Sequence, residues 1–285
     1  MSYKAVARQR FPRITRTVLG WTEGWNRVGL QMAFYTRTIA EIRTALVYYR
    51  VEVLRLIAQM SLGAGALAVI GGTIVIVGFL TLSTGATVAV QGYNSLAGIG
   101  VEALTGFTSA YVNVRLVSPA VVGIGLAATI GAGATAQLGA MRINEEIDAL
   151  EVMGVRSIAY LVSSRVMAGV IVVIPLYCVA VIMSFLAARA STTLGYGQST
   201  GVYDHYFNTF LRSSDLIWSF LEVIAMGIAI MLVHTYYGYT AVGGPAGVGE
   251  AVGRAVRTSL VVSAFVIVSI ALAVYGQSGN FNLSG

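Results

Sequence analysis

The stretch from residue 158 to residue 188, IAYLVSSRVMAGVIVVIPLYCVAVIMSFLAA, decides the fold class of this chain. It is 31 residues long and holds a single charged side chain, Arg165. A helix needs roughly 20 mostly apolar residues to cross the hydrocarbon core of a bilayer. The stretch is long enough to cross as one helix, so it predicts that lipid solvates part of the chain.

The composition agrees with a membrane location. Only 11% of the residues are charged and 56% are hydrophobic, whereas soluble domains carry about 25% charged residues. Four further apolar segments are long enough to cross the bilayer. Together they give five expected spans, at about 56–82, 112–138, 158–188, 215–236 and 258–276. We therefore predict an all-α membrane protein with five transmembrane helices.

The basic residues are distributed unevenly between the two sides of these spans. Cytoplasmic segments of membrane proteins are enriched in Lys and Arg. Fifteen of the 18 Lys and Arg residues fall on the side of the N-terminus, whereas only Arg115, Arg189 and Arg212 fall on the other side. This bias predicts a cytoplasmic N-terminus and an external C-terminus. It also accounts for the net charge of +6 without nucleic acid as a partner.

Residues 1–50 form a segment of their own ahead of the spanning domain, residues 51–285. Apolar residues recur in this segment at intervals of three and four, the periodicity of one face of a helix. They are Phe11, Ile14, Val18, Trp21, Trp25, Val28 and Met32. Because arginines occupy much of the remaining surface, we expect an amphipathic helix lying in the cytoplasmic interface. A soluble helix packed on a cytoplasmic partner is the alternative.

The chain offers little for catalysis or metal binding. A phosphate-binding loop needs a lysine after a glycine-rich turn, and the single lysine is Lys4. The two histidines, His205 and His234, are expected on opposite sides of the membrane, which disfavours a metal site and a nucleophile–base pair. These features favour a transporter or a scaffold over an enzyme, and we expect this chain to bind no cofactor itself.

An acidic stretch, NEEIDALEVMGV at residues 144–155, holds four of the 12 acidic residues between the second and third spans. On a helix, its acidic and apolar side chains would form two rows on different faces. These rows are Glu145, Asp148 and Glu151, and Ile147, Leu150 and Met153. Such a helix is suited to docking into a groove of a soluble protein. A surface helix packed under its own bundle is the alternative.

Glu222 is an ionisable residue roughly two turns into the fourth expected span. Such a side chain is costly in a membrane and usually faces a cavity or a partner. One interpretation places Glu222 in a substrate cavity, facing Arg115. The other places it near the outer headgroups without a partner.

Residues 128–170, ATIGAGATAQLGAMRINEEIDALEVMGVRSIAYLVSSRVMAGV, resemble the signature region of the MlaE/YrbE permeases. These permeases are membrane subunits of ABC-type lipid transporters that work with MCE-domain proteins. Other landmarks occur in the family's order, from about residue 45 onward. They are Gln91-Gly92-Tyr93, Arg115, Pro119, Tyr237-Gly238-Tyr239 and Ala246-Gly247-Val248.

The resemblance implies an interfacial helix followed by five spans, and two permeases that pair. Each permease would dock a separate ATPase subunit, which binds ATP and magnesium, through a coupling helix at about residues 142–154. The residues expected to contact the ATPase are Arg142, Glu145, Glu146, Asp148, Leu150, Glu151 and Met153. The residues expected around a lipid cavity are Leu82, Val90, Tyr93, Arg115 and Glu222.

The sequence also departs from the family pattern. An arginine is common where this chain has Thr129, a glutamate is common at Gln137 and Leu116, and a basic residue can replace Glu222. These departures imply an asymmetric pair in which a paralogous permease supplies the missing charges.

Mce-type systems encode two such permeases, reside in the bacterial plasma membrane and are viewed as importers of fatty acids, sterols or related lipids. The resemblance therefore implies that this chain is the permease subunit of an ATP-driven lipid importer. There are two alternatives to this function. One is an ion-coupled secondary transporter that uses Glu222, and the other is a non-transporting membrane anchor for MCE proteins.

Overall fold

The structure is a computed structural model that describes residues 12–62 and 72–275. Every regular element in these two ranges is helical. Three parts of the expected architecture lie outside the described residues. They are residues 1–11 of the interfacial segment, residues 63–71 of the first expected span and the C-terminal residues 276–285.

In the described part of the chain, five helical segments are long and apolar enough to cross a membrane, which confirms the predicted fold class. They are Gly72–Ala97, Glu102–Ile143, Ile158–Gly195, Ser213–Tyr239 and Gly244–Val274. The second and fifth are longer than expected. The other helical segments of the described chain are shorter or more polar and flank this bundle.

The first span differs from the expected range of 56–82. Residues 56–62 belong to a separate helix, and the spanning helix α6 runs from Gly72 to Ala97. Hydropathy falls after residue 82 because threonines appear, but these threonines satisfy their hydroxyl groups within the helix. Thr84 Oγ1 donates to the Leu80 carbonyl at 2.8 Å, and Thr87 Oγ1 donates to the Ser83 carbonyl at 2.8 Å. The helix therefore continues through residues that look like its end.

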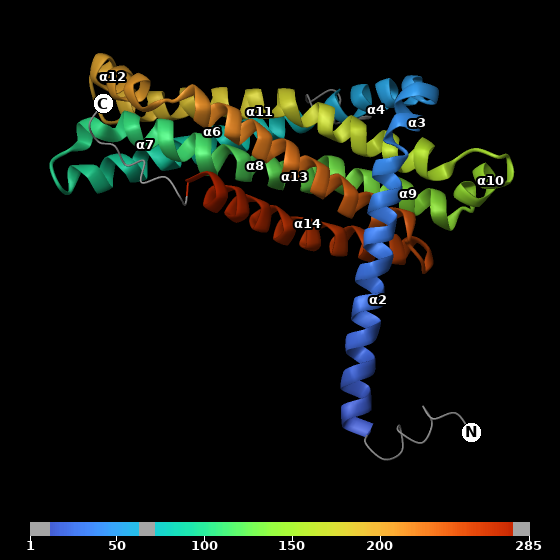
Figure 1. Cartoon of the computed structure of the whole chain (residues 1–285). Helices are drawn as coiled ribbons and strands as arrows, with labels where there is room; N and C mark the ends of the chain where they lie inside the picture. Colours follow the sequence, from blue (N-terminus) through green and yellow to red (C-terminus); the bar gives the residue numbers. More distant parts are fainter. Residues whose placement is uncertain (1–11, 63–71, 276–285) are drawn as a thin grey trace.

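Within the described residues, three helices precede the spans: α2 (Pro12–Ala40), α3 (Ile42–Tyr48) and α4 (Arg50–Leu62). α2 runs crosswise to the bundle and projects beyond it (Figure 1). Trp25, Leu30 and Met32 on α2 are exposed. Exposed apolar side chains on a helix that runs across the bundle suit the membrane interface, and this location stays a prediction.

The second and third spans are composite helices. The second contains η1 (Glu102–Leu104), α7 (Thr105–Val112), η2 (Asn113–Val117), α8 (Ser118–Leu126), η3 (Ala127–Gly131) and α9 (Ala132–Ile143). The third contains η4 (Ile158–Ser163), α11 (Ser164–Ala190) and η5 (Ser191–Gly195). The segments η2, η3, η4 and η5 are π-helical. Such turns are rare and often mark functional sites.

Short helices distinguish the two ends of the bundle (Figure 1). α10 (Glu146–Val152) joins the second span to the third and lies at the same end as α3. α12 (Thr200–Phe210) joins the third span to α13 (Ser213–Tyr239) at the opposite end. The last span, α14 (Gly244–Tyr275), begins again at the α10 end. We refer to these as the α10 end and the α12 end.

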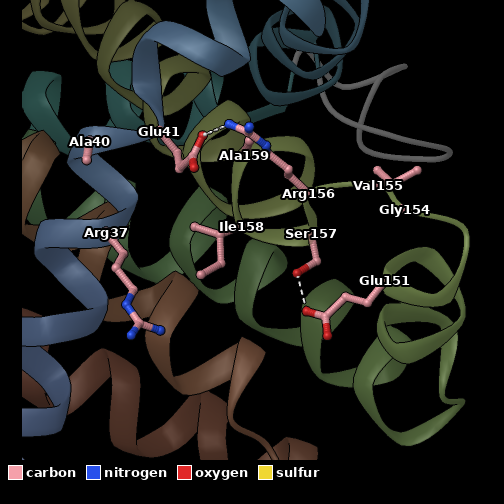
Figure 2. Close-up of a pocket in the computed structure, with 10 residues that line it drawn as sticks. All are labelled: Arg37, Ala40, Glu41, Glu151, Gly154, Val155, Arg156, Ser157, Ile158 and Ala159. Atoms are coloured by element: carbon pink, nitrogen blue, oxygen red, sulfur yellow. Dashed lines mark hydrogen bonds and ion pairs between the residues drawn. The ribbon is translucent and has the colours of Figure 1, made fainter.

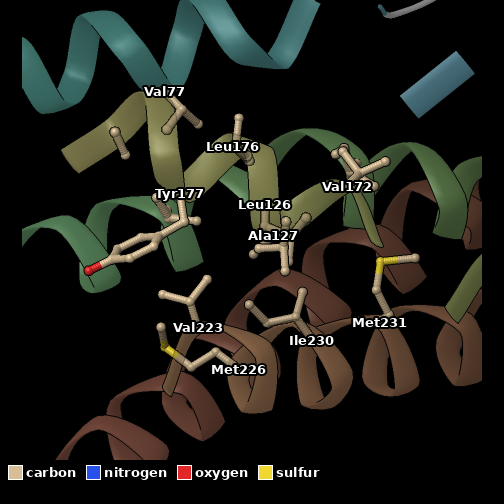
Figure 3. Close-up of a cluster of buried hydrophobic side chains, with 14 of the residues drawn as sticks. Val77, Leu126, Ala127, Val172, Leu176, Tyr177, Val223, Met226, Ile230 and Met231 are labelled. Carbon is tan, nitrogen blue, oxygen red and sulfur yellow. The ribbon is translucent and has the colours of Figure 1, made fainter. Parts of the chain in front are cut away.

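The core lies between α6, the second span, α11 and α13 (Figure 3). Leu126, Leu176 and Ile230 are buried there, and Met226 and Met231 fill the space along α13. Lipid is as apolar as this core, so close packing rather than exclusion of water holds such helices together.

Small residues bring the spans into close contact. A Cβ atom at Gly85 of α6 would lie 2.6 Å from the Ser184 carbonyl oxygen of α11. A Cβ atom at Gly131 would lie 2.6 Å from the His234 ring. Gly133 differs, because a Cβ atom there would have no neighbouring heavy atom within 4 Å and the helix surface is open.

Candidate functional site

A sharp turn separates α9 from α10. Glu145 adopts a left-handed conformation with φ of 61°, which non-glycine residues seldom adopt. Arg142 Nη1 donates to Asp148 Oδ1 at 2.6 Å across this turn. Glu145 therefore precedes the helix instead of heading an acidic row along it, and that detail of the expected pattern is wrong.

The expected apolar row of α10 is divided between two environments. Ile147 is fully buried against Leu138, Leu161 and Val162 of the same chain, and Leu150 is partly buried beside it. The side chain of Met153 lies beyond the end of the helix and is 68% exposed. The apolar row was expected to enter a groove of a partner protein. Ile147 and Leu150 instead hold α10 on its own bundle.

What α10 presents to solvent is an acidic and apolar surface, which we call the α10 surface. Glu145, Glu146 and Asp148 are exposed. They lie beside Val152, which is 89% exposed, and Met153. Exposed apolar groups bordered by charges are typical of protein interaction sites. Val152 was not expected here, since it falls in neither row of the helical pattern.

Glu151 is also exposed, but it differs from these acids because it is hydrogen-bonded to residues outside α10 and its N-terminal turn. Ser157 Oγ donates to Glu151 Oε1 at 2.5 Å (Figure 2). The two residues border a cavity of about 420 Å³ between α2 and the segment that follows α10. Arg156 Nη1 lies 3.5 Å from Glu41 Oε2 on the α2 side of this cavity. The sequence predicted Glu151 as an ATPase contact but gave no indication of these internal contacts.

An exposed apolar stripe on α6 contains two of the residues expected around a lipid cavity. Leu82 is 42% exposed and Val90 is 38% exposed. Val75 and Phe79 extend the stripe at helical spacing and are also exposed. Tyr93 ends it, with its ring stacked on Tyr196 at a centroid distance of 4.0 Å.

Arg115 lies in the π-helical segment η2 and forms an ion pair across the bundle. Its Nη2 lies 2.7 Å from Asp215 Oδ2, and the two side chains are only 14% and 9% exposed. The guanidinium also lies 3.9 Å from the centroid of the Tyr111 ring, a favourable cation–π geometry. Asp215 was not predicted as a site residue, because a lone acid at the start of a span resembles a helix cap.

Glu222 does not face Arg115, as one interpretation of the sequence had expected. It is buried inside the bundle at 4% exposure, and its Oε1 has no hydrogen-bond partner among the described residues. The carboxylate that pairs with Arg115 is Asp215, on the same helix as Glu222 but two turns earlier. Glu222 therefore does not line the exposed α6 stripe of a single protomer.

Two of the family departures meet in a second cavity, of about 510 Å³. Thr129 and Gln137 line it together with Leu56, Met60 and Val252. Thr73 Oγ1 donates to Thr129 Oγ1 at 3.2 Å, and Thr129 Oγ1 donates to the Gly125 carbonyl at 2.6 Å. All residues that line this cavity are uncharged. Thr129 and Gln137 stand where charged residues are common in the family, so the cavity of this chain has a neutral lining.

The α12 end is held by one ion pair and one buried tyrosine. Arg189 donates two hydrogen bonds of 2.8 Å to Asp204, and these bonds hold the pKa of Asp204 below its usual value. Tyr203 is buried, and burial raises its pKa to about 12. A Cβ atom at Gly106 would lie 2.5 Å from the Tyr203 carbonyl oxygen, so α12 packs directly on α7.

This arrangement, five spans with a short acidic helix between the second and third, agrees with the comparison with known families. The family model described as "Permease MlaE" matches residues 62–274. The chain belongs to the MlaE permease family. Membership identifies this MlaE-family chain as an ABC transporter permease and a multi-pass membrane protein, and such permeases work with an ATPase partner.

Known relatives of this MlaE-family permease come from bacteria and plants. It is 28% identical over 204 residues to a Rickettsia bellii protein named "Probable ABC transporter permease protein", covering 68% of this chain and 73% of that protein. A Rickettsia prowazekii protein with a similar name is 28% identical over 213 residues, with the same coverage. The chloroplast protein TRIGALACTOSYLDIACYLGLYCEROL 1 of Arabidopsis thaliana is 32% identical over 149 residues, which are 52% of this chain and 42% of that protein.

Proposed function

We propose that this protein is the membrane subunit of an ATP-driven lipid transporter, docking a separate ATPase through the α10 surface. The observation that carries the proposal is the α10 surface itself: a short helix, held by buried Ile147, that presents acids and two apolar side chains away from the bundle. In this arrangement ATP and magnesium bind to the ATPase, and the α10 end faces the cytoplasm. The excess of Lys and Arg on that side supports this orientation.

Two features of the bundle support lipid as the cargo. The exposed stripe on α6 is apolar along its length, from Val75 through Phe79 to Leu82, so it suits hydrocarbon tails in a cavity between two permeases. The name of the Arabidopsis relative contains trigalactosyldiacylglycerol, which is a lipid. Asp215, which pairs with Arg115, lies in the first turn of α13, directly after α12, so a headgroup that passes the α12 end would meet this buried pair.

The remaining partners follow from the resemblance to Mce-type systems. The second permease is a paralogue that supplies charges absent at Thr129 and Gln137. MCE-domain proteins bind at the α12 end, outside the bacterial plasma membrane, and the complex imports fatty acids, sterols or related lipids. The neutral lining of the cavity around Thr129 and Gln137 agrees with a weakly charged or uncharged cargo.

A matched pair of charge reversals tests the docking surface. Glu146 on α10 and Glu250 at the start of α14 are both exposed and lie toward the same end of the bundle. Glu146→Lys should lower the amount of ATPase that co-purifies with the tagged permease by about tenfold, since reversing one interfacial charge leaves like charges in contact. Glu250→Lys should leave it unchanged. Equal recovery with both variants would reject the α10 surface as the docking site.

One observation favours a second function, an ion-coupled secondary transporter. Glu222 is a buried carboxylate with an unpartnered oxygen inside a span, the kind of group that proton-coupled transporters use. This function predicts that lipid uptake collapses when the membrane potential is removed and that Glu222→Gln abolishes it. The ATP-driven function predicts uptake that depends on ATP and persists without the potential.

A further inference from the structure

The landmark Tyr237-Gly238-Tyr239 places three consecutive residues against three different parts of the protein. Tyr237 Oη lies 3.3 Å from Thr258 Oγ1 of α14. Gly238 allows α13 to touch α9, because a Cβ atom there would lie 2.8 Å from the Thr135 carbonyl oxygen. Tyr239 reaches the segment around α10. The end of α13 is therefore a junction between the last span, the second span and α10.

At this junction the hydroxyl groups of Tyr239 and Ser157 both donate hydrogen bonds to Glu151. Tyr239 Oη donates to Glu151 Oε1 at 3.1 Å, and Ser157 Oγ donates to the same oxygen at 2.5 Å. The two hydroxyl oxygens lie 2.9 Å apart. Hydrogen bonds to a carboxylate are roughly twice as strong as those between neutral groups. One oxygen of Glu151 thus ties the last turn of α10 to the end of α13 and the start of the third span.

The connections on either side of α10 make this tie mechanically important. The chain enters α10 through the left-handed turn at Glu145 and leaves it through Gly154, which has φ of 78°. Because both connections are tight turns and not continuous helix, a push on α10 is not passed directly along a helix axis to the neighbouring spans. Contacts of α10 side chains with the bundle must transmit it. Tyr239 of α13 packs against the apolar cluster that contains Ile147, and the side-chain hydrogen bond from Tyr239 to α10 is the one to Glu151.

We propose that Tyr239 is a positioning residue that, through Glu151 and Ser157, transmits movement of α10 to α13 and so couples the ATPase to the spans. This inference rests on the proposed function, since it takes the ATPase as the source of movement. It assigns Glu151 an internal role, whereas Glu146 and Asp148 are exposed on the α10 surface where the ATPase would dock. It also gives the Tyr237-Gly238-Tyr239 landmark a function at the junction.

The test uses Tyr239→Phe in the permease co-purified with its ATPase. Hydrogen exchange is measured at α10 and at residues 232–239 of α13, with and without a non-hydrolysable ATP analogue. In the wild type the analogue should change exchange in both segments. In Tyr239→Phe the analogue should still change exchange at α10. The change that it causes in the opening equilibrium of α13 should be about tenfold smaller than in the wild type. This factor corresponds to the loss of one hydrogen bond to a charged group.

Three further variants separate coupling from folding and from docking. Tyr48 is the last residue of α3, a helix at the α10 end, and is 78% exposed. Tyr48→Phe removes its hydroxyl group and should behave as the wild type. Ser157→Ala should reproduce Tyr239→Phe and carries the test if that variant does not fold. Glu151→Gln keeps an acceptor oxygen for both hydroxyls, so it should retain most of the coupling.

Two outcomes would overturn the inference. One is an unchanged response of α13 in both Tyr239→Phe and Ser157→Ala. The other is loss of the ATPase from Tyr239→Phe during purification, which would make the junction part of the docking site. Failure of the wild type to retain any ATPase would instead refute the proposed function, and the inference with it.

Discussion

Replacing Ile147 by alanine tests whether one buried side chain holds α10 on the bundle. Ile147 is fully buried and packs with Leu138, Leu161 and Val162. α10 has seven residues, well below the roughly 12–15 at which isolated helices become even marginally stable in water. The helix therefore depends on tertiary packing, and Ile147 is its deepest contact.

The expected effect follows from the atoms removed. The change from isoleucine to alanine deletes the equivalent of three buried methylene groups, at about 0.8 kcal/mol each, or about 2.4 kcal/mol. Any cavity left behind raises the cost toward the range of about 2–5 kcal/mol seen for such truncations. Since 1.4 kcal/mol is a factor of ten, the undocked population of α10 should rise about 50-fold.

Hydrogen exchange on the purified permease measures this population directly. The Ala149 amide donates to the Glu145 carbonyl at 3.0 Å, and the Met153 amide donates to the Ala149 carbonyl at 3.1 Å. Both amides should lose about 50-fold in protection in Ile147→Ala. The matched control is Val152→Ala, an exposed site on the same helix, where a surface change of about 0.5 kcal/mol or less predicts at most about a twofold loss. Protection that differs by less than threefold between the two variants would refute the argument (about 0.6 kcal/mol).

Two further predictions concern stability of the bundle, measured by thermal unfolding in detergent. Asp215→Ala should destabilise the protein by about 3–5 kcal/mol, because it removes the carboxylate from a buried ion pair with Arg115; Asp215→Asn keeps an acceptor and should lose less. Gly85→Ala should cost about 1–3 kcal/mol, because its Cβ would press on the Ser184 carbonyl oxygen, which is backbone and cannot move aside. Gly133→Ala, with no neighbour within 4 Å, should cost nothing; equal melting temperatures for the two glycine variants would contradict this.

Hydropathy placed most of the spans but misplaced the first, whose helix begins and ends later in the sequence than expected. A window of residues 56–82 is apolar enough to cross the membrane, yet the spanning helix runs to Ala97. Its second half contains threonines whose hydroxyl groups bond to carbonyls one turn earlier. A hydropathy sum counts these hydroxyls as polar, although in a helix they expose few unsatisfied groups to lipid.

The acidic helix shows a similar limit at the level of single residues. The sequence predicted a helix near residues 142–154 and its acidic character. It did not predict the left-handed turn at Glu145, the burial of Ile147 or the internal bonds of Glu151. These depend on where the third span and α13 lie relative to α10, and those positions are set by contacts between residues far apart in the chain.

The sequence by itself determined that this chain is helical, resides in a membrane and crosses it five times, because those properties follow from local composition and the cost of unpaired backbone groups in lipid. It also located the segment that carries the α10 surface. Only the tertiary structure decided which carboxylate pairs with Arg115 and which acid of α10 is hydrogen-bonded to the bundle. Asp215 and Glu222 are both acids of one helix, and their roles differ because helix packing brings one to a cation and leaves the other buried, with an oxygen that has no hydrogen-bond partner among the described residues.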